Sequence, residues 1–277
     1  MRLAKNFIVI FTMLAIILST PTIVFADSYI DWEKGIVRGT GLVLGPKNVN
    51  MKSNFYKTHA RQAARLDALR NIAETIFGVD VIKDFEKDEN GLERESITTK
   101  LNHESLIPVA KLAKQIGEAK FYEEDGACEL SMEVILYGKA SISEELFSNS
   151  KHAKLESFPK PINNALKIND KYTGLIIDCS NLKLNPTLSP ILKNDKDQLI
   201  YSYKNLPYDI LINGLVAYSK GVNNLNRAGQ KPLIIKAVAL DKNSRSNPIV
   251  SIADSDKILV ANQNSHFLNK GAVVFIY

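Results

Sequence analysis

The stretch ARQAARLDALRNIAETIFG, Ala60–Gly78, decides the fold of this 277-residue chain more than any other. Small and apolar residues recur every four positions within it, at Ala60, Ala64, Ala68, Ile72 and Ile76. This spacing predicts an amphipathic helix over about Lys52–Phe77, ended by Gly78. A stripe with so little side chain lets the helix lie close to the surface it covers, and a β-sheet is the surface we expect.

Extended segments before and after this helix supply the expected sheet. Trp32–Leu44 has the alternation of a strand although it contains glycines. Asp125-Gly126 is a strong turn signal between strands at Ala119–Glu124 and Ala127–Tyr137, so a hairpin is predicted there.

The segment between the helix and the hairpin is less regular. Glu86–Glu95 is rich in charge and predicts a loop or an exposed edge. Ser96–Ile116 has helical spacing that Pro108 interrupts, and an extended strand before Pro108 is the alternative for part of it. The first half is therefore expected to be α+β, a small sheet covered by an alanine-rich helix.

Composition changes at Asn149–Lys171, where two prolines and five lysines stand among few large apolar residues. This predicts a linker between a domain at residues 27–148 and a strand-rich C-terminal domain at residues 172–277. Ala253–Val260 predicts only a short helical turn. Strands of the second domain are expected at Tyr172–Cys179, Ile191–Lys193, Leu199–Tyr203, Asn213–Ala217, Pro232–Leu240, Pro248–Ile252 and Gly271–Tyr277.

The first 26 residues have the order of a secretory signal peptide. Arg2 and Lys5 precede the apolar run FIVIFTMLAIIL, and Val24-Phe25-Ala26 supplies small residues for cleavage. The apolar run is shorter than the roughly 20 helical residues that span a bilayer. The alternative to a cleaved signal peptide is an uncleaved membrane anchor. We expect cleavage after Ala26 and a periplasmic or secreted protein with no membrane span. Because no Cys follows the run, no lipid anchor is expected either.

Charge and cysteine content narrow the function classes. The formal net charge is +5, too small for this length to favour a nucleic-acid partner. Cys128 and Cys179 either form a disulfide in an oxidising compartment or are two buried free thiols. The histidines show no ligand spacing, so neither a metal nor a cofactor is expected; they are His59, His103, His152 and His266.

Three acids of the second half are the candidates for chemistry. Asp178 ends an apolar strand, and Asp254 and Asp256 form a pair. Carboxylates in such places do acid–base work or hold a metal, although turn capping is the simpler explanation. Gly39-Thr40-Gly41 with Gly45 matches a dinucleotide loop loosely, and glycines in a bending strand are again simpler. No catalytic residue is therefore assigned.

The predicted helix also carries a row of cations. Lys52, Lys57, Arg61, Arg65 and Arg70 fall outside its alanine stripe. A solvated face is the default explanation, and an anionic lipid or an acidic partner is the alternative.

The entry segment WEKGIVRGTGLVLGP and the alanine-rich helix resemble the LPP-type small surface lipoproteins of the bacterial envelope. They are also similar to the N-terminal domain of flagellar assembly protein T. In those families a helix of the type A-x-x-A-A-x-x-D-A packs on a small sheet. Here it stands as Ala60, Ala63, Ala64, Asp67 and Ala68. The second half, through YTGLIIDCSNLKLNPTLSPIL and KPLIIKAV, resembles C-terminal parts of exported bacterial proteins of this group.

This resemblance implies a non-enzymatic exported envelope protein with an assembly or interaction role, either surface-associated or flagellum-like. Its partners would be envelope proteins or further copies of itself. The alternative is a secreted hydrolase or ligand-binding protein that uses Asp178, Asp254 or Asp256. That alternative predicts a pocket in which these acids converge with His or Arg.

Overall fold

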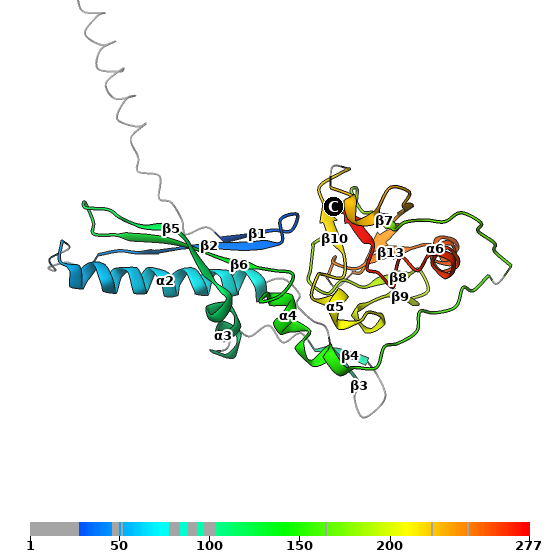
Figure 1. The fold of residues 1–277 in the computed structure, drawn as a ribbon, viewed down its shortest axis with the longest axis horizontal. Coiled ribbons are helices and arrows are strands. Elements are labelled where there is room, and N and C mark those ends of the chain that lie inside the picture. The colour runs from blue at the N-terminus through cyan, green and yellow to red at the C-terminus, as the bar shows by residue number, and fades with distance from the viewer. Residues whose placement is uncertain are drawn as a thin grey trace, which may run out of the picture.

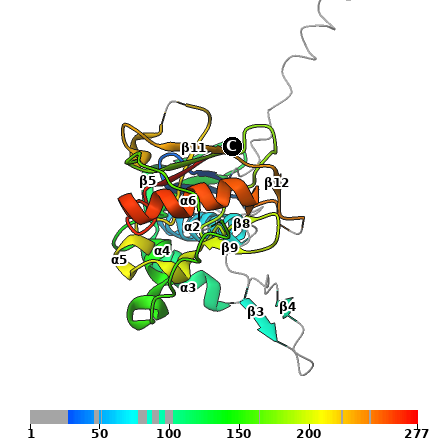
Figure 2. The same cartoon turned by 90° about the vertical axis from the view of Figure 1, so that its right-hand side faces the viewer.

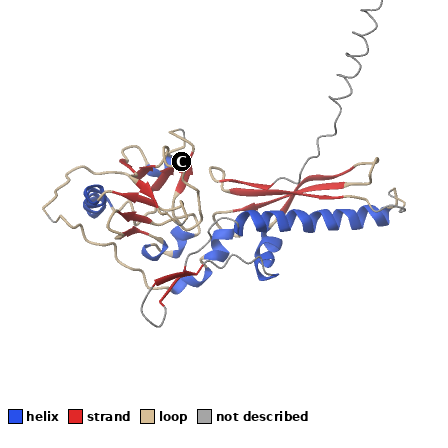
Figure 3. Ribbon diagram, turned by 180° about the vertical axis from the view of Figure 1, so that it is seen from behind, coloured by secondary structure: helices blue, strands red, loops and turns tan. Residues whose placement is uncertain are grey.

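The computed structural model describes residues 28–45, 50, 52–77, 84–87, 93–96, 103–163, 165–222, 224–242 and 244–277. Its elements form two parts that follow the two halves of the chain (Figure 1). Both parts combine helices with small sheets, which confirms the α+β class (Figure 3). The predicted signal peptide at residues 1–26 lies outside the described residues. Among the described helices, none is long and apolar enough to cross a membrane.

The first half is built on a four-stranded antiparallel sheet of order β1-β2-β6-β5. Asp125-Gly126 forms the turn of the β5–β6 hairpin, with Gly126 at φ 65°, so the predicted hairpin is confirmed. Residues 32–35 form the turn before β2 instead of belonging to a strand. The strands are β1 (Ser28–Asp31), β2 (Ile36–Val43), β5 (Lys114–Phe121) and β6 (Cys128–Ile135).

The predicted helix is α2 (Asn54–Phe77), which runs along one face of this sheet (Figure 1). Its alanine stripe is buried against β2 and β6. A Cβ atom added to Gly41 would lie 1.9 Å from the carbonyl oxygen of Ala64 and 2.5 Å from the amide nitrogen of Ala68. Helix and strand therefore meet backbone to backbone, as the small residues of both predicted.

The opposite face of the sheet is polar. Alternate residues of β2 and β6 point away from α2 and pair across the strands. Arg38 and Glu133 form an ion pair at 2.7 Å, and the hydroxyls of Thr40 and Ser131 lie 2.9 Å apart. This alternation explains why the sequence of β6 reads as a half-buried strand.

Side chains of α2 complete the edge of β2 where β1 ends. The register of β1 begins at Ser28 opposite Gly39, which leaves Thr40 and Leu42 without a strand partner on that side among the described residues. Asp67 accepts a hydrogen bond from the amide of Leu42 at 3.1 Å. Asn71 donates one to the carbonyl of Thr40 at 2.9 Å. The edge groups of β2 are thus satisfied without a further strand.

The segment between helix and hairpin contains a pair of strands and a further helix. Glu86–Glu95 is predicted as a loop or an exposed edge. Its described ends belong to β3 (Asp84–Lys87) and β4 (Glu93–Ser96), which pair in a sheet of two strands, so both are edge strands. The predicted helical spacing further on corresponds to α3 (His103–Leu112), which contains Pro108 and packs on α2.

The second half holds two four-stranded sheets. One is fully parallel, of order β10-β14-β7-β11, and the other is mixed, of order β12-β13-β8-β9. The strand expected at Asn213–Ala217 corresponds to β10, which lies later in the chain and begins at Ala217. The strands are β7 (Leu175–Asp178), β8 (Leu192–Asn194), β9 (Leu199–Tyr201), β10 (Ala217–Ser219), β11 (Leu233–Lys236), β12 (Ala239–Leu240), β13 (Pro248–Val250) and β14 (Val273–Ile276).

A long helix of the second half exceeds its prediction. Ala253–Val260 belongs to α6 (Ile252–Ser265), a helix of 14 residues that crosses the second half in Figure 2. Ser251 caps it by accepting a hydrogen bond from the amide of Asp254 at 3.1 Å. The remaining short helices are α4 (Ile142–Leu146), η1 (Ser148–His152), η2 (Tyr203–Asn205), α5 (Tyr208–Leu211) and η3 (Asn226–Ala228).

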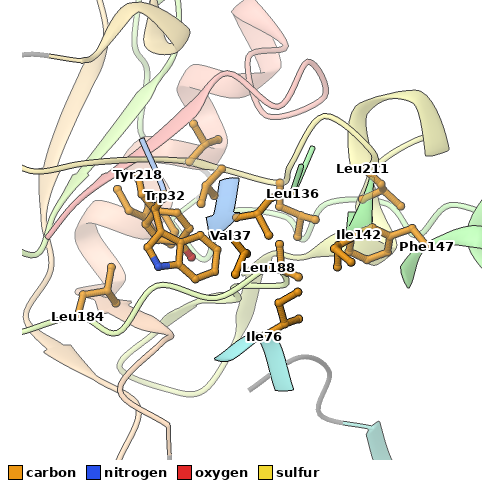
Figure 4. Close-up of a cluster of buried hydrophobic side chains, with 14 of the residues drawn as sticks. Trp32, Val37, Ile76, Leu136, Ile142, Phe147, Leu184, Leu188, Leu211 and Tyr218 are labelled. Carbon is orange, nitrogen blue, oxygen red and sulfur yellow. The ribbon is translucent and has the colours of Figure 1, made fainter. Parts of the chain in front are cut away.

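The two halves share one hydrophobic core at their junction (Figure 4). Trp32, in the turn between β1 and β2, lies edge-on to Tyr218 of β10 with ring centroids 5.4 Å apart. The amide of Gly138 donates to the carbonyl of Ile212 at 2.7 Å. Side chains from both halves fill the rest of the junction, namely Val37, Ile76, Leu136, Ile142, Phe147, Leu184, Leu188 and Leu211.

The predicted linker packs on the second half. After η1, the described residues up to β7 form neither helix nor strand. The amide of Glu156 donates to the carbonyl of Lys204 at 2.9 Å, and the side chain of Asn264 donates to the carbonyl of Ile168 at 2.7 Å. These bonds join the connection to the half that follows it at Glu156 and at Ile168.

Candidate functional site

Each of the three candidate acids accepts hydrogen bonds that stabilise a turn, a helix start or a connecting segment. Asp178, at the end of β7, accepts a hydrogen bond from the amide of Ser180 at 3.0 Å. Bonds from the side chain and backbone of Ser180 hold the pKa of Asp178 below its ordinary value. This carboxylate closes the turn after the strand, as the capping explanation predicts.

Asp254 belongs to the first turn of α6. Its carboxylate accepts from the hydroxyl of Ser251 at 2.7 Å and pairs with Lys257 at 2.9 Å. Burial raises the pKa of Asp254, but the bonds from Lys257 and Ser251 outweigh burial and leave that pKa below its ordinary value. An acid at this place stabilises the start of the helix.

Asp256, two residues later, is buried and turned toward the connecting segment. Its two carboxylate oxygens accept from the amides of Ile162 and Asn163, at 2.7 and 2.9 Å. The carboxylate thus ties α6 to the connection between the halves. Asp254 and Asp256 are neighbours in sequence, but they bond to different segments and do not act as a pair.

Both cysteines are buried free thiols in the structure. Cys128 begins β6, and Cys179 follows β7. Burial raises the pKa of Cys179 to about 12 and also raises the pKa of Cys128. Both thiols are therefore protonated at neutral pH, which is the unreactive form.

Two of the three glycines of the loose dinucleotide pattern lie in a strand, and Gly45 lies two residues after its end. Gly39 and Gly41 belong to β2 and face α2. They serve the close contact between strand and helix and do not form a phosphate loop. Within the described parts of the chain, no group of three or more His, Cys, Asp or Glu residues is arranged to hold a metal ion.

A polar pocket of about 250 Å³ lies at the junction of the halves. The carboxylate of Glu33 accepts from the amide of Lys220 at 3.0 Å, and the Lys220 ammonium lies 5.9 Å from the ring centre of Tyr277. Burial, followed by the charges of Glu33 and Asp31, raises the pKa of Tyr277. Sequence reasoning missed this pocket because its walls come from residues that are remote in the chain. It is lined by Tyr29, Ile30, Asp31, Trp32, Glu33, Lys220 and Tyr277.

The N-terminal part of α2 presents an uncovered side, which we call the outer face. It carries two large apolar side chains in solvent, Phe55 at 74% and Leu66 at 68% exposure. The ring of His59 lies 4.2 Å from that of Phe55. The exposed residues of the outer face are Asn54, Phe55, Lys57, Thr58, His59, Arg61, Gln62, Arg65 and Leu66.

The outer face ends where α3 begins to cover the helix. Leu69 and Ala73 follow Gln62 by seven and eleven positions and so continue the same side of α2, yet both are buried. Val109 of α3 is also fully buried in the same core cluster. The sequence indicates this surface, because Phe55 and Leu66 are large apolar residues that fall outside the alanine stripe and so do not face the sheet.

The outer face is strongly cationic. No acid occurs between Lys52 and Leu66. The cationic ends of Lys57 and Arg61 each lie 5.8 Å from the ring centre of Phe121, which holds them beside β5. A pocket of about 230 Å³ adjoins this end of the helix and is lined by Lys52, Tyr56, Lys57, Phe121, Tyr122, Glu123 and Gly126.

Positive charge at this end of a helix is unfavourable for the helix alone. The macrodipole places partial positive charge at the N-terminus, where acids are stabilising and cations are not. The first turn of α2 contains no acid. A bound anionic group would offset both the cations and the dipole.

The second half matches a family model described as Treponema pallidum Tp0624, second domain. The match covers residues 174–277, which contain every strand of the two sheets in that half. No curated protein matches this chain. The outer face lies outside the matched residues, so the resemblance of the first half to envelope families stays a prediction.

Proposed function

We propose that this chain is a non-enzymatic exported protein of the bacterial envelope with an assembly or interaction role. It binds another component of the envelope through the outer face of α2. The surface-associated or flagellum-like role implied by the resemblance, and envelope proteins or further copies as partners, belong to this proposal. Export follows from the predicted signal peptide at residues 1–26.

The outer face carries this proposal. Phe55 and Leu66 are 74% and 68% exposed on a helix whose alanine stripe is packed on the sheet. Exposed apolar side chains that are accompanied by charge of one sign are typical of interaction sites. The longest helix of the protein thus offers one side to the fold and another to a partner.

The roles found for the candidate acids and thiols agree with a non-enzymatic protein. Asp178 and Asp254 serve turns and caps, Asp256 fastens the connecting segment, and the thiols of Cys128 and Cys179 are held protonated. Catalysis by any of the three carboxylates would compete with the hydrogen bonds that it accepts, and each thiol would first have to lose its proton. The hydrolase alternative loses its support for that reason.

Binding of a small ligand at the junction pocket is a second candidate function. The pocket lies beside the carboxyl ends of β10 and β14, the edge at which parallel sheets commonly bind ligands. Asp31, Glu33 and Lys220 provide polar groups there. This site would use acids of the first half instead of Asp178, Asp254 or Asp256.

Site-specific photocrosslinking in intact cells tests the main proposal. A photoreactive amino acid replaces Leu66 in one strain and Val222, which is 75% exposed in the second half, in a control strain. We expect adducts with a protein or a lipid at position 66 and few at position 222. Absence of adducts at position 66, with the chain in the soluble fraction, would refute the proposal.

A further inference from the structure

We propose that the partner of the outer face is a lipid surface with anionic headgroups. This inference rests on the function proposed above and assigns the class of its partner. The chain would lie on the surface through the N-terminal part of α2, as an interfacial helix does, and would not span it.

Charge is the first reason. Lys57, Arg61 and Arg65 are exposed within a segment that contains no acid. Lys52 and Lys57 also line the adjoining pocket together with one acid, Glu123, so Lys52 is the further cation at this end and positive charge stays in excess. Phosphate headgroups attract such a cluster of cations. The partial positive charge at the N-terminus of α2 also attracts a phosphate bound there.

The spacing of the apolar side chains is the second reason. Phe55 and Leu66 are eleven residues apart, which places them on one side of the helix, about 16 Å from each other. The positions between them on that side are His59 and Gln62, which are polar. A protein groove that receives a helix needs apolar anchors at these intermediate positions. Shallow insertion of two separate side chains among headgroups has no such requirement.

The limits of the outer face are the third reason. Arg70, the next cation along α2, pairs with Asp67 at 2.6 Å and with Glu74 at 3.7 Å. Its charge is therefore already matched within the helix. The excess of positive charge ends at Arg65, next to Leu66, so the cations and the two exposed apolar side chains occupy the same stretch of α2.

Vesicle co-sedimentation tests the inference. The processed protein, recovered from the cells that export it, is mixed with vesicles of phosphatidylcholine alone or with about 30% phosphatidylglycerol. We expect binding to the anionic vesicles at low salt and release at about 0.5 M NaCl. Equal binding to both kinds of vesicle would overturn the inference, because it would show attachment without headgroup charge.

A charge variant with a matched control locates the binding surface. Lys57→Gln, Arg61→Gln and Arg65→Gln together should lower partitioning onto anionic vesicles on the order of 100-fold. The control removes three exposed cations of the connecting segment, by Lys154→Gln, Lys160→Gln and Lys167→Gln. The control should bind within about threefold of the parent. Equal losses in both variants would overturn the assignment to the outer face.

An apolar variant tests insertion separately. Phe55→Ser with Leu66→Ser keeps every charge and should lower partitioning about 10-fold or more. Circular dichroism spectra of all variants should match that of the parent, because the substituted side chains are exposed. An unchanged partition coefficient in a folded variant would show that Phe55 and Leu66 do not enter the headgroup region.

The lipid inference and the proposed function fail in different ways. Failure of binding to anionic vesicles, together with protein adducts at position 66 in cells, would overturn the lipid partner and leave the interaction role standing. Lipid adducts at position 66 would support both. Failure of vesicle binding without any adduct at position 66 would refute both.

Discussion

The helix–strand contact of the first half and the aromatic core of the second half are packed in different ways. In the first half, α2 meets β2 backbone to backbone at Gly41 and Ala64. The second half is filled by large side chains, of which Tyr201, Phe267 and Phe275 are fully buried. The contact at Gly41 therefore has no space for an added atom, whereas the core around Phe275 is stabilised by the large side chains that fill it.

The largest effect is expected from an added side chain at the helix–strand contact. Gly41→Val should lower the free energy of unfolding by about 5 kcal/mol or more, because its Cβ would overlap the backbone of Ala64 and neither partner can rotate away. Urea unfolding followed by circular dichroism measures this loss.

A valine at the neighbouring position is the control. Thr40→Val places the same side chain on the open face of β2 and loses the contact between Thr40 and Ser131, so it should cost about 1 kcal/mol. Similar losses for Gly41→Val and Thr40→Val would show that α2 does not lie as close to β2 as described.

A removed side chain should have the next largest effect. Phe275→Ala should lower the free energy of unfolding by about 4 kcal/mol, because Phe275 is fully buried against Tyr218 and leaves a cavity. Phe275→Leu fills most of that space and should cost about 1.5 kcal/mol. The same urea titration compares them. Equal losses of unfolding free energy for Phe275→Ala and Phe275→Leu would mean that neighbouring side chains move in and fill the cavity.

Removal of Trp32 tests whether the two halves unfold together. Trp32→Ala should cost about 3 kcal/mol and weaken the junction, because its ring packs on Tyr218 across the two halves. We expect one calorimetric unfolding transition for the parent, because the halves share a core, and two for the variant. One transition at a lower temperature would show that other residues of the junction suffice to couple the halves.

A smaller effect is expected at the edge of β2. Asp67→Ala should cost about 1–2 kcal/mol, since it leaves the amide of Leu42 without its acceptor and removes the pair with Arg70. Asp67→Asn keeps an oxygen at the acceptor position and should recover part of the loss. Thermal unfolding of both variants measures the difference. If Asn recovers nothing, the charge of Asp67 and not its bond to Leu42 is what stabilises the edge.

The smallest effect is a dependence of stability on pH at the start of α6. Because the pKa of Asp254 in the folded state lies below its unfolded value, its carboxylate stabilises the fold above about pH 4. That contribution is lost as the pH falls through the folded-state pKa. Partial exposure of Asp254 and Lys257 limits it to less than about 1 kcal/mol. Asp254→Asn should reduce the dependence of the free energy of unfolding on pH between pH 5 and 3. An unchanged dependence would show that other acids cause it.

Local patterns predicted the first half well. The alanine spacing places α2 within two residues, and Asp125-Gly126 places the β5–β6 hairpin. Both signals lie within a few turns of chain, so no distant partner is needed to interpret them. The small residues of α2 even predicted the kind of surface it covers.

Contacts between distant residues account for what was missed. The parallel sheet joins strands that begin at Leu175, Ala217, Leu233 and Val273, and no local pattern indicates which strands pair. The run Ile258–Ala261 is apolar without a gap, which does not distinguish a helix from a strand, so α6 was predicted too short. The junction pocket and the covering of α2 by α3 were missed for the same reason, because both depend on contacts between residues that are distant in the sequence.

The length of α2 has a spatial consequence. Its 24 residues make a rod about 36 Å long. One end reaches the junction through Ile76, and the other carries the outer face away from the second half (Figure 1). Gly39 and Gly41 bring β2 into close contact with the middle of this rod, from Ala64 to Ile72. A partner bound at the outer face would therefore be held away from the second half by the length of helix between the two.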